Sequence, residues 1–209
     1  MGALLESQYG LPALVAAAAY LFGAIPFGLL LTKAAGLGDV RSIGSGNIGA
    51  TNVLRTGNKS LAAATLLLDA GKGVAAVLLV RFVIGERLDL LEPLAAGAAL
   101  VGHCYPVWLR FKGGKGVATF LGIAFALWWP IGVVAAVTWV AAMAITRYSS
   151  VGGLAAANAA PIAAAILGRM DLALFFLGVA FLIDWKHRAN IVRLANGTEP
   201  KVGRKEQPA

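Results

Sequence analysis

The chain has 209 residues, of which 59% are hydrophobic and only 13% are charged, and its mean hydropathy is +0.77. Soluble domains are typically about 45–50% apolar and about 25% charged, so this composition excludes an ordinary soluble domain and indicates an integral membrane protein. The net charge is +8, and the single cysteine, Cys104, excludes an intrachain disulfide.

Apolar segments of spanning length recur along the chain. A membrane-spanning helix needs about 20 mostly apolar residues, with a range of about 17–25. The first segment is interpreted as a retained helix and not as a signal peptide, because Glu6 is the only charged residue that precedes it. Seven spans within a single polytopic all-α domain are predicted: residues 11–31, 61–84, 93–109, 116–128, 130–146, 151–168 and 172–184.

The count of seven depends on the long uncharged run from Gly116 to Ile145. As one helix it would be roughly 45 Å long, against a hydrocarbon core of about 30 Å. Trp128, Trp129 and Pro130 stand in its middle. Proline ends helices and tryptophan prefers the membrane interface, so two short helices are predicted in place of one.

The basic residues indicate an orientation for these spans. With the N-terminus outside, the inner segments are 32–60, 110–116, 146–150 and the cytoplasmic tail 185–209. Positive charge is enriched on the inner side of membrane proteins, which predicts an outer N-terminus and an inner C-terminus. These segments hold 14 of the 18 basic residues: Lys33, Arg41, Arg55, Lys59, Arg110, Lys112, Lys115, Arg147, Lys186, Arg188, Arg193, Lys201, Arg204 and Lys205.

The segment Arg41–Arg55 is rich in glycines and in small hydroxyl or amide side chains. Glycines leave backbone N–H groups open to an anion, Ser, Thr and Asn add donors, and arginine binds phosphate bidentately. A Gly-x-Gly-x-x-Gly spacing also fits a dinucleotide fingerprint, but that fingerprint needs a preceding strand, and a membrane span precedes it here. A site for a phosphorylated ligand is predicted at Gly44, Ser45, Gly46, Asn47, Gly49, Thr51, Asn52 and Arg55.

A second glycine segment, Lys112–Gly116, stands at the start of an apolar helix. Ammonium groups, open amides and a helix N-terminus together favour anion binding. A Walker A loop is excluded, because Gly116 stands where Ser or Thr is required. Further polar groups on the same predicted side are Ser150 and the pair His187 and Asn190, which share a face if helical. The predicted binding residues of this segment are Gly113, Gly114, Lys115 and Gly116, with Lys112 beside them.

Two charged residues lie within the second span, Asp69 and Lys72. Charges inside a membrane are costly and suggest function, and an ion pair that supports the inner site is favoured here over direct chemistry. His103 is as well suited to bracing the second glycine segment as to reacting. No cluster of metal ligands is visible in the sequence, so we expect no metal and no cofactor.

These motifs resemble, in order and from end to end, the signatures of the bacterial acyl-phosphate:glycerol-3-phosphate acyltransferases, the PlsY family. Several motifs coincide, which makes the resemblance far more specific than any single glycine pattern. The matching stretches are residues 45–55, 102–119, 147–150, 187–194 and 197–199, with Asp69, Lys72 and Gly73 in the second span.

The resemblance implies an all-α membrane enzyme that transfers a fatty acyl group from acyl phosphate to the 1-hydroxyl of glycerol 3-phosphate. The products would be lysophosphatidate and phosphate, in the first step of membrane phospholipid synthesis. It implies the bacterial cytoplasmic membrane, a site that faces the cytoplasm, and no nucleic acid partner; we expect a monomer. A transporter of a phosphorylated anion is the alternative, although no inverted repeat is visible.

Roles follow from that hypothesis. Ser45 and the first glycine segment would hold the acyl-phosphate head, and Lys112 and Arg55 would neutralise the departing phosphate and orient glycerol 3-phosphate. Ser150 would help to complete the acceptor pocket. His187 would be either a general base, for which an unperturbed pKa of about 6.5 is suitable, or a hydrogen-bond donor while phosphate takes the proton. A Ser45 acyl-enzyme is disfavoured, because no base adjoins it in sequence. The predicted catalytic residues are Ser45, Arg55, Lys112, His187 and Asn190.

Overall fold

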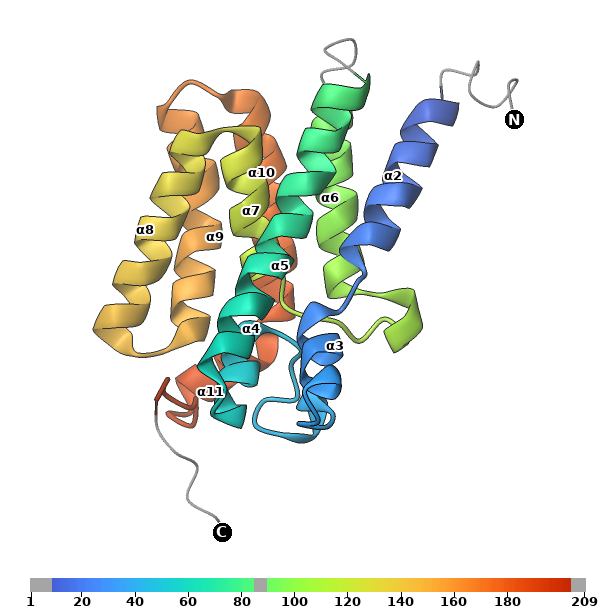
Figure 1. The fold of residues 1–209 in the computed structure, drawn as a ribbon. Helices are drawn as coiled ribbons and strands as arrows, with labels where there is room; N and C mark the ends of the chain where they lie inside the picture. The colour runs from blue at the N-terminus through green and yellow to red at the C-terminus, as the bar shows by residue number, and fades with distance from the viewer. Residues whose placement is uncertain (1–8, 85–89, 204–209) are drawn as a thin grey trace.

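The computed structural model describes residues 9–84 and 90–203, which contain helices and no strand (Figure 1). Of the charges used above for orientation, Glu6, Arg204 and Lys205 lie outside the described residues. The long helices stand side by side and run between two ends of the molecule. The short helices α3, α4 and α11 gather at one of these ends, the lower end in Figure 1. That end corresponds to the inner side predicted from the sequence.

The helices alternate with short turns. Three short 3₁₀ turns are Val40–Ser42, Leu54–Thr56 and Val107–Leu109, and α5 continues as a π-helical turn over Val80–Ile84. The α-helices are α2 Gly10–Gly23, α3 Phe27–Ala34, α4 Ala50–Val53, α5 Lys59–Leu79, α6 Leu91–Cys104, α7 Val117–Leu127, α8 Trp129–Thr146, α9 Ser149–Ile166, α10 Met170–Lys186 and α11 Arg188–Ala195.

Two predicted segments are wrong as single helices, and proline is the cause in both. The segment 11–31 is divided into α2 and α3, with Pro26 between them. The segment 93–109 is helical only to Cys104, because Pro106 follows. Proline lacks an N–H and disfavours the α conformation of the residue before it. The predicted interruption at Trp128 is present, and α8 carries Pro130 in its first turn, where proline is tolerated.

The break between α2 and α3 leaves backbone carbonyls without helical partners, and distant side chains satisfy them. The Trp108 indole N–H donates to the Ala24 carbonyl at 2.7 Å, and the Lys72 ammonium donates to the Ile25 carbonyl at 2.9 Å. Within a membrane such carbonyls have no water to bind, so internal donors are required. The break therefore joins the α6–α7 connection and α5 to the first helices.

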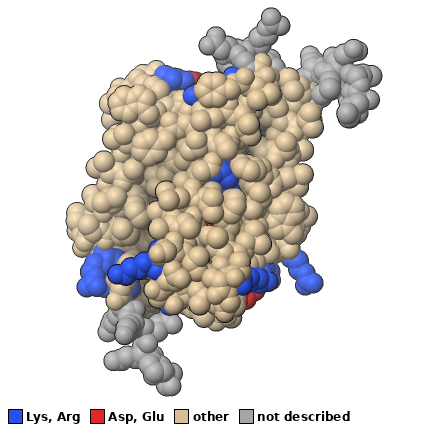
Figure 2. All heavy atoms as spheres, viewed as in Figure 1, with Lys and Arg blue, Asp and Glu red and all other residues tan. Residues whose placement is uncertain are grey.

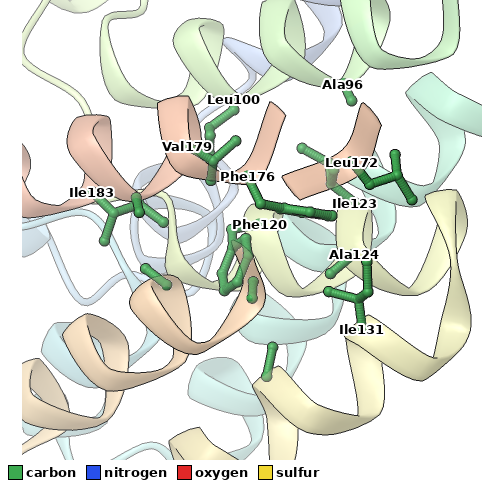
Figure 3. Close-up of a cluster of buried hydrophobic side chains, with 14 of the residues drawn as sticks. Ala96, Leu100, Phe120, Ile123, Ala124, Ile131, Leu172, Phe176, Val179 and Ile183 are labelled. Atoms are coloured by element: carbon green, nitrogen blue, oxygen red, sulfur yellow. The ribbon is translucent and has the colours of Figure 1, made fainter. Parts of the chain in front are cut away.

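The apolar core lies between α7, α8, α9 and α10, with α6 against it (Figure 3). Phe120 of α7 and Phe176 of α10 meet edge to face, with ring centroids 6.0 Å apart. Ile123 and Ile131 are fully buried beside them. Alanines supply most of the α9 surface that faces this core. Small residues allow helices to approach closely, which is how helices commonly associate in membranes.

The outer surface of the bundle is apolar along its flanks. In Figure 2 the lysines and arginines gather mainly at the lower end, with fewer at the upper end, and the flank between is almost entirely uncharged. Three helical stretches within the described residues are long and apolar enough to cross a membrane: Gly10–Ala34, Trp129–Thr146 and Ser149–Ile166. The distribution of charge agrees with the sequence-based expectation of an integral membrane protein.

The contact between α5 and α7 depends on glycines. A Cβ built on Gly122 would lie 2.1 Å from the Ala70 carbonyl oxygen, and one built on Gly73 would lie 2.5 Å from the Thr119 carbonyl oxygen. Both obstacles are backbone atoms, which cannot move aside without shifting a helix. By contrast, a Cβ on Gly71 meets nothing within 4 Å.

We expect Gly122→Ala to lower the free energy of unfolding, because the added methyl group forces α5 and α7 apart. Overpacking of this kind typically costs about 1–3 kcal/mol. Gly71→Ala is the matched control in the same helix pair, and it should be neutral or stabilising by up to about 1 kcal/mol, from helix propensity. Thermal unfolding in detergent, followed by tryptophan fluorescence, measures both. Equal midpoints for the two variants would contradict this account of the α5–α7 contact.

Candidate functional site

The first glycine segment folds around the side chain of Asn52, which is 2% exposed. Its Nδ2 donates to the carbonyls of Val40 at 2.7 Å, Asn47 at 2.8 Å and Ile43 at 3.2 Å. Its Oδ1 accepts the Ser45 N–H at 3.1 Å. The amide of Asn52 is thus fully used in holding the loop. Asn52, which was predicted to bind substrate, anchors the loop through these bonds and also lines the cavity described below.

Glycine is required at position 44 by both conformation and space. Gly44 has φ +52°, in the left-handed region, and a Cβ there would lie 2.3 Å from Arg55 Nη1. The loop therefore passes directly over the Arg55 guanidinium. Helix α4 follows at Ala50 and carries the chain from the loop to Arg55. The predicted grouping of the first glycine segment with Arg55 is present in the structure.

The second glycine segment is held against the end of α6. The Gly114 N–H donates to the His103 carbonyl at 3.0 Å, and the Gly113 N–H donates to the Cys104 carbonyl at 3.2 Å. These bonds turn the chain so that Lys115 points to the interior side of the loop, while Lys112 is exposed. Gly116, with φ +87°, then begins α7.

A carboxylate joins the remaining predicted polar groups. Glu199 Oε1 accepts hydrogen bonds from Ser150 Oγ at 2.7 Å and from Asn190 Nδ2 at 2.6 Å, and Glu199 Oε2 pairs with Arg193 Nε at 2.7 Å. Burial opposes ionisation of Glu199, but these donors outweigh it and hold its pKa below the usual value. Because a carboxylate only accepts, Asn190 must present its amide N–H to it. Asn190 Oδ1 is left buried, with no hydrogen-bond partner among the described residues.

His187 is the C-cap of α10 and is 2% exposed. Its pKa is lowered to about 4, mainly by burial and to a smaller extent by the nearby charge of Lys115, while the contact with the Ile183 carbonyl opposes the shift. The ring is therefore neutral at physiological pH. Its Nδ1 lies 2.8 Å from the Ile183 carbonyl, which can only accept, so Nδ1 carries the proton and Nε2 is an acceptor.

These groups surround one cavity of about 550 Å³. Its size falls within the range of small-molecule sites. Of the predicted residues, those that line it are Ser45, Asn47, Gly49, Thr51, Asn52, Arg55, Asp69, His103, Lys115, Gly116, Ser150, His187 and Asn190. Those that the structure does not bring to its wall are Gly44, Gly46, Lys72, Lys112, Gly113 and Gly114.

The charge around the cavity is predominantly positive. Within the described part of the chain, its basic lining residues are Arg55, Lys115, Arg193 and Lys201, against two acidic ones, Asp69 and Glu199. A cavity that collects cations, neutral donors and glycine-rich backbone is suited to phosphorylated ligands.

Comparisons with known proteins agree with this chemistry. The family model described as "Glycerol-3-phosphate acyltransferase" matches residues 13–197. The chain belongs to the glycerol-3-phosphate acyltransferase family. The sequence-based resemblance is thereby confirmed.

Relatives and solved structures of this family match almost the whole chain. The glycerol-3-phosphate acyltransferase of Maricaulis maris is 59% identical over 91% of this chain and 87% of its own length. The glycerol-3-phosphate acyltransferase of Dinoroseobacter shibae is 56% identical over 97% of this chain and 98% of its own length. A crystal structure of PlsY (YgiH), an integral membrane glycerol 3-phosphate acyltransferase in its glycerol 3-phosphate form, is 34% identical, with a TM-score of 0.85 over 92% of this chain and 96% of that one. A crystal structure of the lysophosphatidic acid form of PlsY (YgiH) is 32% identical, with a TM-score of 0.83 over 91% of this chain and 94% of that one.

Two features of the acyltransferase cavity were not predicted from the sequence. Glu199 and Arg193 belong to it, although only Ser150 and Asn190 were singled out among their partners. The tail also forms part of the wall, because the Val202 N–H donates to the Arg147 carbonyl at 2.8 Å. The available signal for Glu199 was its place in the matching stretch 197–199, as an acidic residue in a basic tail.

Lys115 gives the cavity a pH dependence. Burial lowers its pKa to about 8; Glu199 opposes this shift, and the charges of Arg193 and Arg55 add to it. The ammonium form binds phosphate, so we expect affinity for inorganic phosphate to fall as pH rises through about 8. Inorganic phosphate is already mainly a dianion at that pH and stays one as the pH rises further, so its own ionisation does not account for the fall.

The measurement is the phosphate dissociation constant from neutral pH to about pH 10, by calorimetry in detergent. Lys115→Arg is the control, because guanidinium stays charged throughout that range. Its affinity should remain constant where that of the unaltered protein declines. A constant affinity in the unaltered protein would show that Lys115 does not govern binding.

Proposed function

We propose that this acyltransferase takes its acyl group from an acyl phosphate and transfers it to the 1-hydroxyl of glycerol 3-phosphate. The products are lysophosphatidate, which is 1-acylglycerol 3-phosphate, and inorganic phosphate, in the first step of membrane phospholipid synthesis. The observation that carries the proposal is the cationic cavity at the end of an apolar bundle, in a chain of this family. Such a cavity accommodates phosphate groups while the acyl tail remains among the helices.

The donor phosphate is assigned to the first glycine segment. Ser45 supplies a hydroxyl at the cavity wall, and Arg55 supplies charge beneath the loop. Because Asn52 holds this backbone independently of any ligand, its donors are in place before the substrate arrives. No base is assigned to activate Ser45, so it binds and does not form an acyl-enzyme; isolation of a covalent acyl-Ser45 adduct would contradict this.

The acceptor is assigned to the opposite wall. Lys115 would bind the phosphate of glycerol 3-phosphate, which takes over the role predicted for Lys112, since Lys112 is exposed away from the cavity. His187 Nε2 and Asn190 Oδ1 are both acceptors and suit the two glycerol hydroxyls. Glu199 fixes Ser150 and Asn190 in the orientation this requires.

The reaction needs mainly positioning and charge neutralisation, because an acyl phosphate is a mixed anhydride with a good leaving group. The 1-hydroxyl oxygen attacks the acyl carbonyl carbon, and the bond from that carbon to the phosphate oxygen breaks. Phosphate leaves with the electron pair and also receives the hydroxyl proton. His187, with a pKa of about 4 in the empty cavity, is too weak a base to keep that proton and serves to orient the hydroxyl.

Lys115→Gln and Lys112→Gln test the assignment as a matched pair from one loop. The assay supplies acyl phosphate and glycerol 3-phosphate to purified protein and measures lysophosphatidate. Loss of a single charge-stabilising donor typically lowers turnover by about 10²–10³-fold, which we expect for Lys115→Gln, whereas Lys112→Gln should retain most activity. The reverse order would restore Lys112 to the site. If the unaltered protein made no lysophosphatidate and carried glycerol 3-phosphate into vesicles, it would be a transporter.

The remaining proposals concern the membrane. Seven spans with an outer N-terminus and an inner C-terminus are supported by the helix order and by the basic residues at the end where the cavity lies. The same features support the proposal of a bacterial cytoplasmic membrane protein with its site toward the cytoplasm, where both phosphorylated substrates would be met. No partner chain is required to complete the cavity, so a monomer is proposed.

Single-cysteine labelling tests the orientation. Leu37 and Leu167 lie in connections between helices at opposite ends of the bundle, and their exposed fractions are 43% and 46%. The native Cys104 is buried. In intact cells an impermeant maleimide should label Leu167→Cys and spare Leu37→Cys, which should react only after permeabilisation. Labelling in the opposite pattern would invert the orientation, and labelling of both variants in intact cells would reject the proposed span count.

A further inference from the structure

An ion pair is buried within α5 near the cavity. Lys72 Nζ lies 2.7 Å from Asp69 Oδ1, and each residue is only 2% exposed. Lys72 does not reach the cavity wall, and neither residue has a role in the proposed transfer. A buried ion pair loses much of its attraction to desolvation, so stability alone is a weak reason for its presence.

The pair is connected at both ends to other segments. Lys72 donates to the Ile25 carbonyl at the break between α2 and α3. On the other side, Asp69 Oδ1 lies 3.6 Å from His103 Nδ1 of α6. At this distance the two atoms are in contact without a hydrogen bond, and His103 Nδ1 has no hydrogen-bond partner among the described residues, so the carboxylate borders the ring and limits its movement.

The opposite side of the ring meets the second glycine segment. A Cβ built on Gly114 would lie 2.0 Å from His103 Nε2 and 2.7 Å from Cε1, so the ring occupies the space of a missing side chain. The Gly114 N–H also donates to the His103 carbonyl at 3.0 Å. Lys115 is the next residue, so the place of the ring determines where the backbone of Lys115 lies.

We propose that His103 is a positioning residue for Lys115, and that the buried pair Asp69 and Lys72 holds its ring in place. The inference rests on the proposed role of Lys115 in binding the phosphate of glycerol 3-phosphate. His103 also lines the cavity, but the role proposed for it here is indirect, through its contact with Gly114. It acts by setting the distance between the Lys115 ammonium and the opposite wall of the cavity.

A double-mutant cycle between positions 103 and 114 tests the coupling. Gly114→Ala places a methyl group in the space that the His103 ring occupies and should therefore displace Lys115. We expect kcat/KM for glycerol 3-phosphate to fall by at least about tenfold, mainly through a higher KM. His103→Ala opens that space. The double variant should therefore be more active than Gly114→Ala alone. Effects that multiply independently would overturn the proposal, because independent sites are additive in free energy.

A second comparison separates positioning from general stability. His103→Asn keeps an N–H near Asp69 but removes the part of the ring that faces Gly114, so KM should rise while the thermal midpoint stays close to that of the unaltered protein. Glu92→Gln breaks the ion pair between Arg81 and Glu92, which also joins α5 to the region of α6 but lies at the far end. It should lower the midpoint without changing KM. The same KM in His103→Asn as in the unaltered protein would overturn the proposal.

Failure of the inference and failure of the proposed function are distinguishable. If Lys115→Gln retains the KM of the unaltered protein, the role of Lys115 is wrong and the positioning argument loses its basis. If Lys115→Gln raises KM while the cycle between positions 103 and 114 is additive, Lys115 binds phosphate but His103 does not position it.

Discussion

The break between α2 and α3 is the constraint on which the end of the molecule that carries the short helices depends. A helix interrupted among apolar neighbours exposes carbonyls that no water can satisfy. Trp108 and Lys72 supply the donors to Ala24 and Ile25, and they come from the α6–α7 connection and from α5. One interruption, caused by Pro26, thereby fixes three parts of the chain relative to one another at the level where the cavity opens.

Each glycine segment is built around a buried polar side chain, and in each the absence of a Cβ makes room for a neighbouring group. Asn52 gathers the carbonyls of the first segment, which passes over Arg55 at Gly44. His103 fills the space beside Gly114 in the second. In both cases the backbone is held by protein groups, so the anion-binding donors need little reorganisation when a phosphate arrives. Such preorganisation is the main source of electrostatic catalysis.

Glu199 connects α9 and α11 where they line the cavity. Its carboxylate binds Ser150 at the start of α9, together with Asn190 and Arg193 of α11. It offsets part of the positive charge that the cavity holds in the absence of a phosphate, and it fixes which end of the Asn190 amide remains available. The tail is thus a structural part of the cavity and not merely a basic extension of the chain.

The sequence by itself determined the membrane class, the helical fold and the family, and most of the residues that it singled out line the cavity, because composition, periodicity and glycine spacing are local properties. The interruption at Pro26 was also local, and was missed only because hydropathy averages over a whole window. The choice between Lys112 and Lys115 was different. Both adjoin glycines, and only the contact of the loop with His103 turns one toward the cavity and the other to the surface. Glu199 lies 49 residues from Ser150, so that bond exists only once α9 and the tail meet. Tertiary structure decided these points, because they depend on contacts between segments that the chain order leaves far apart.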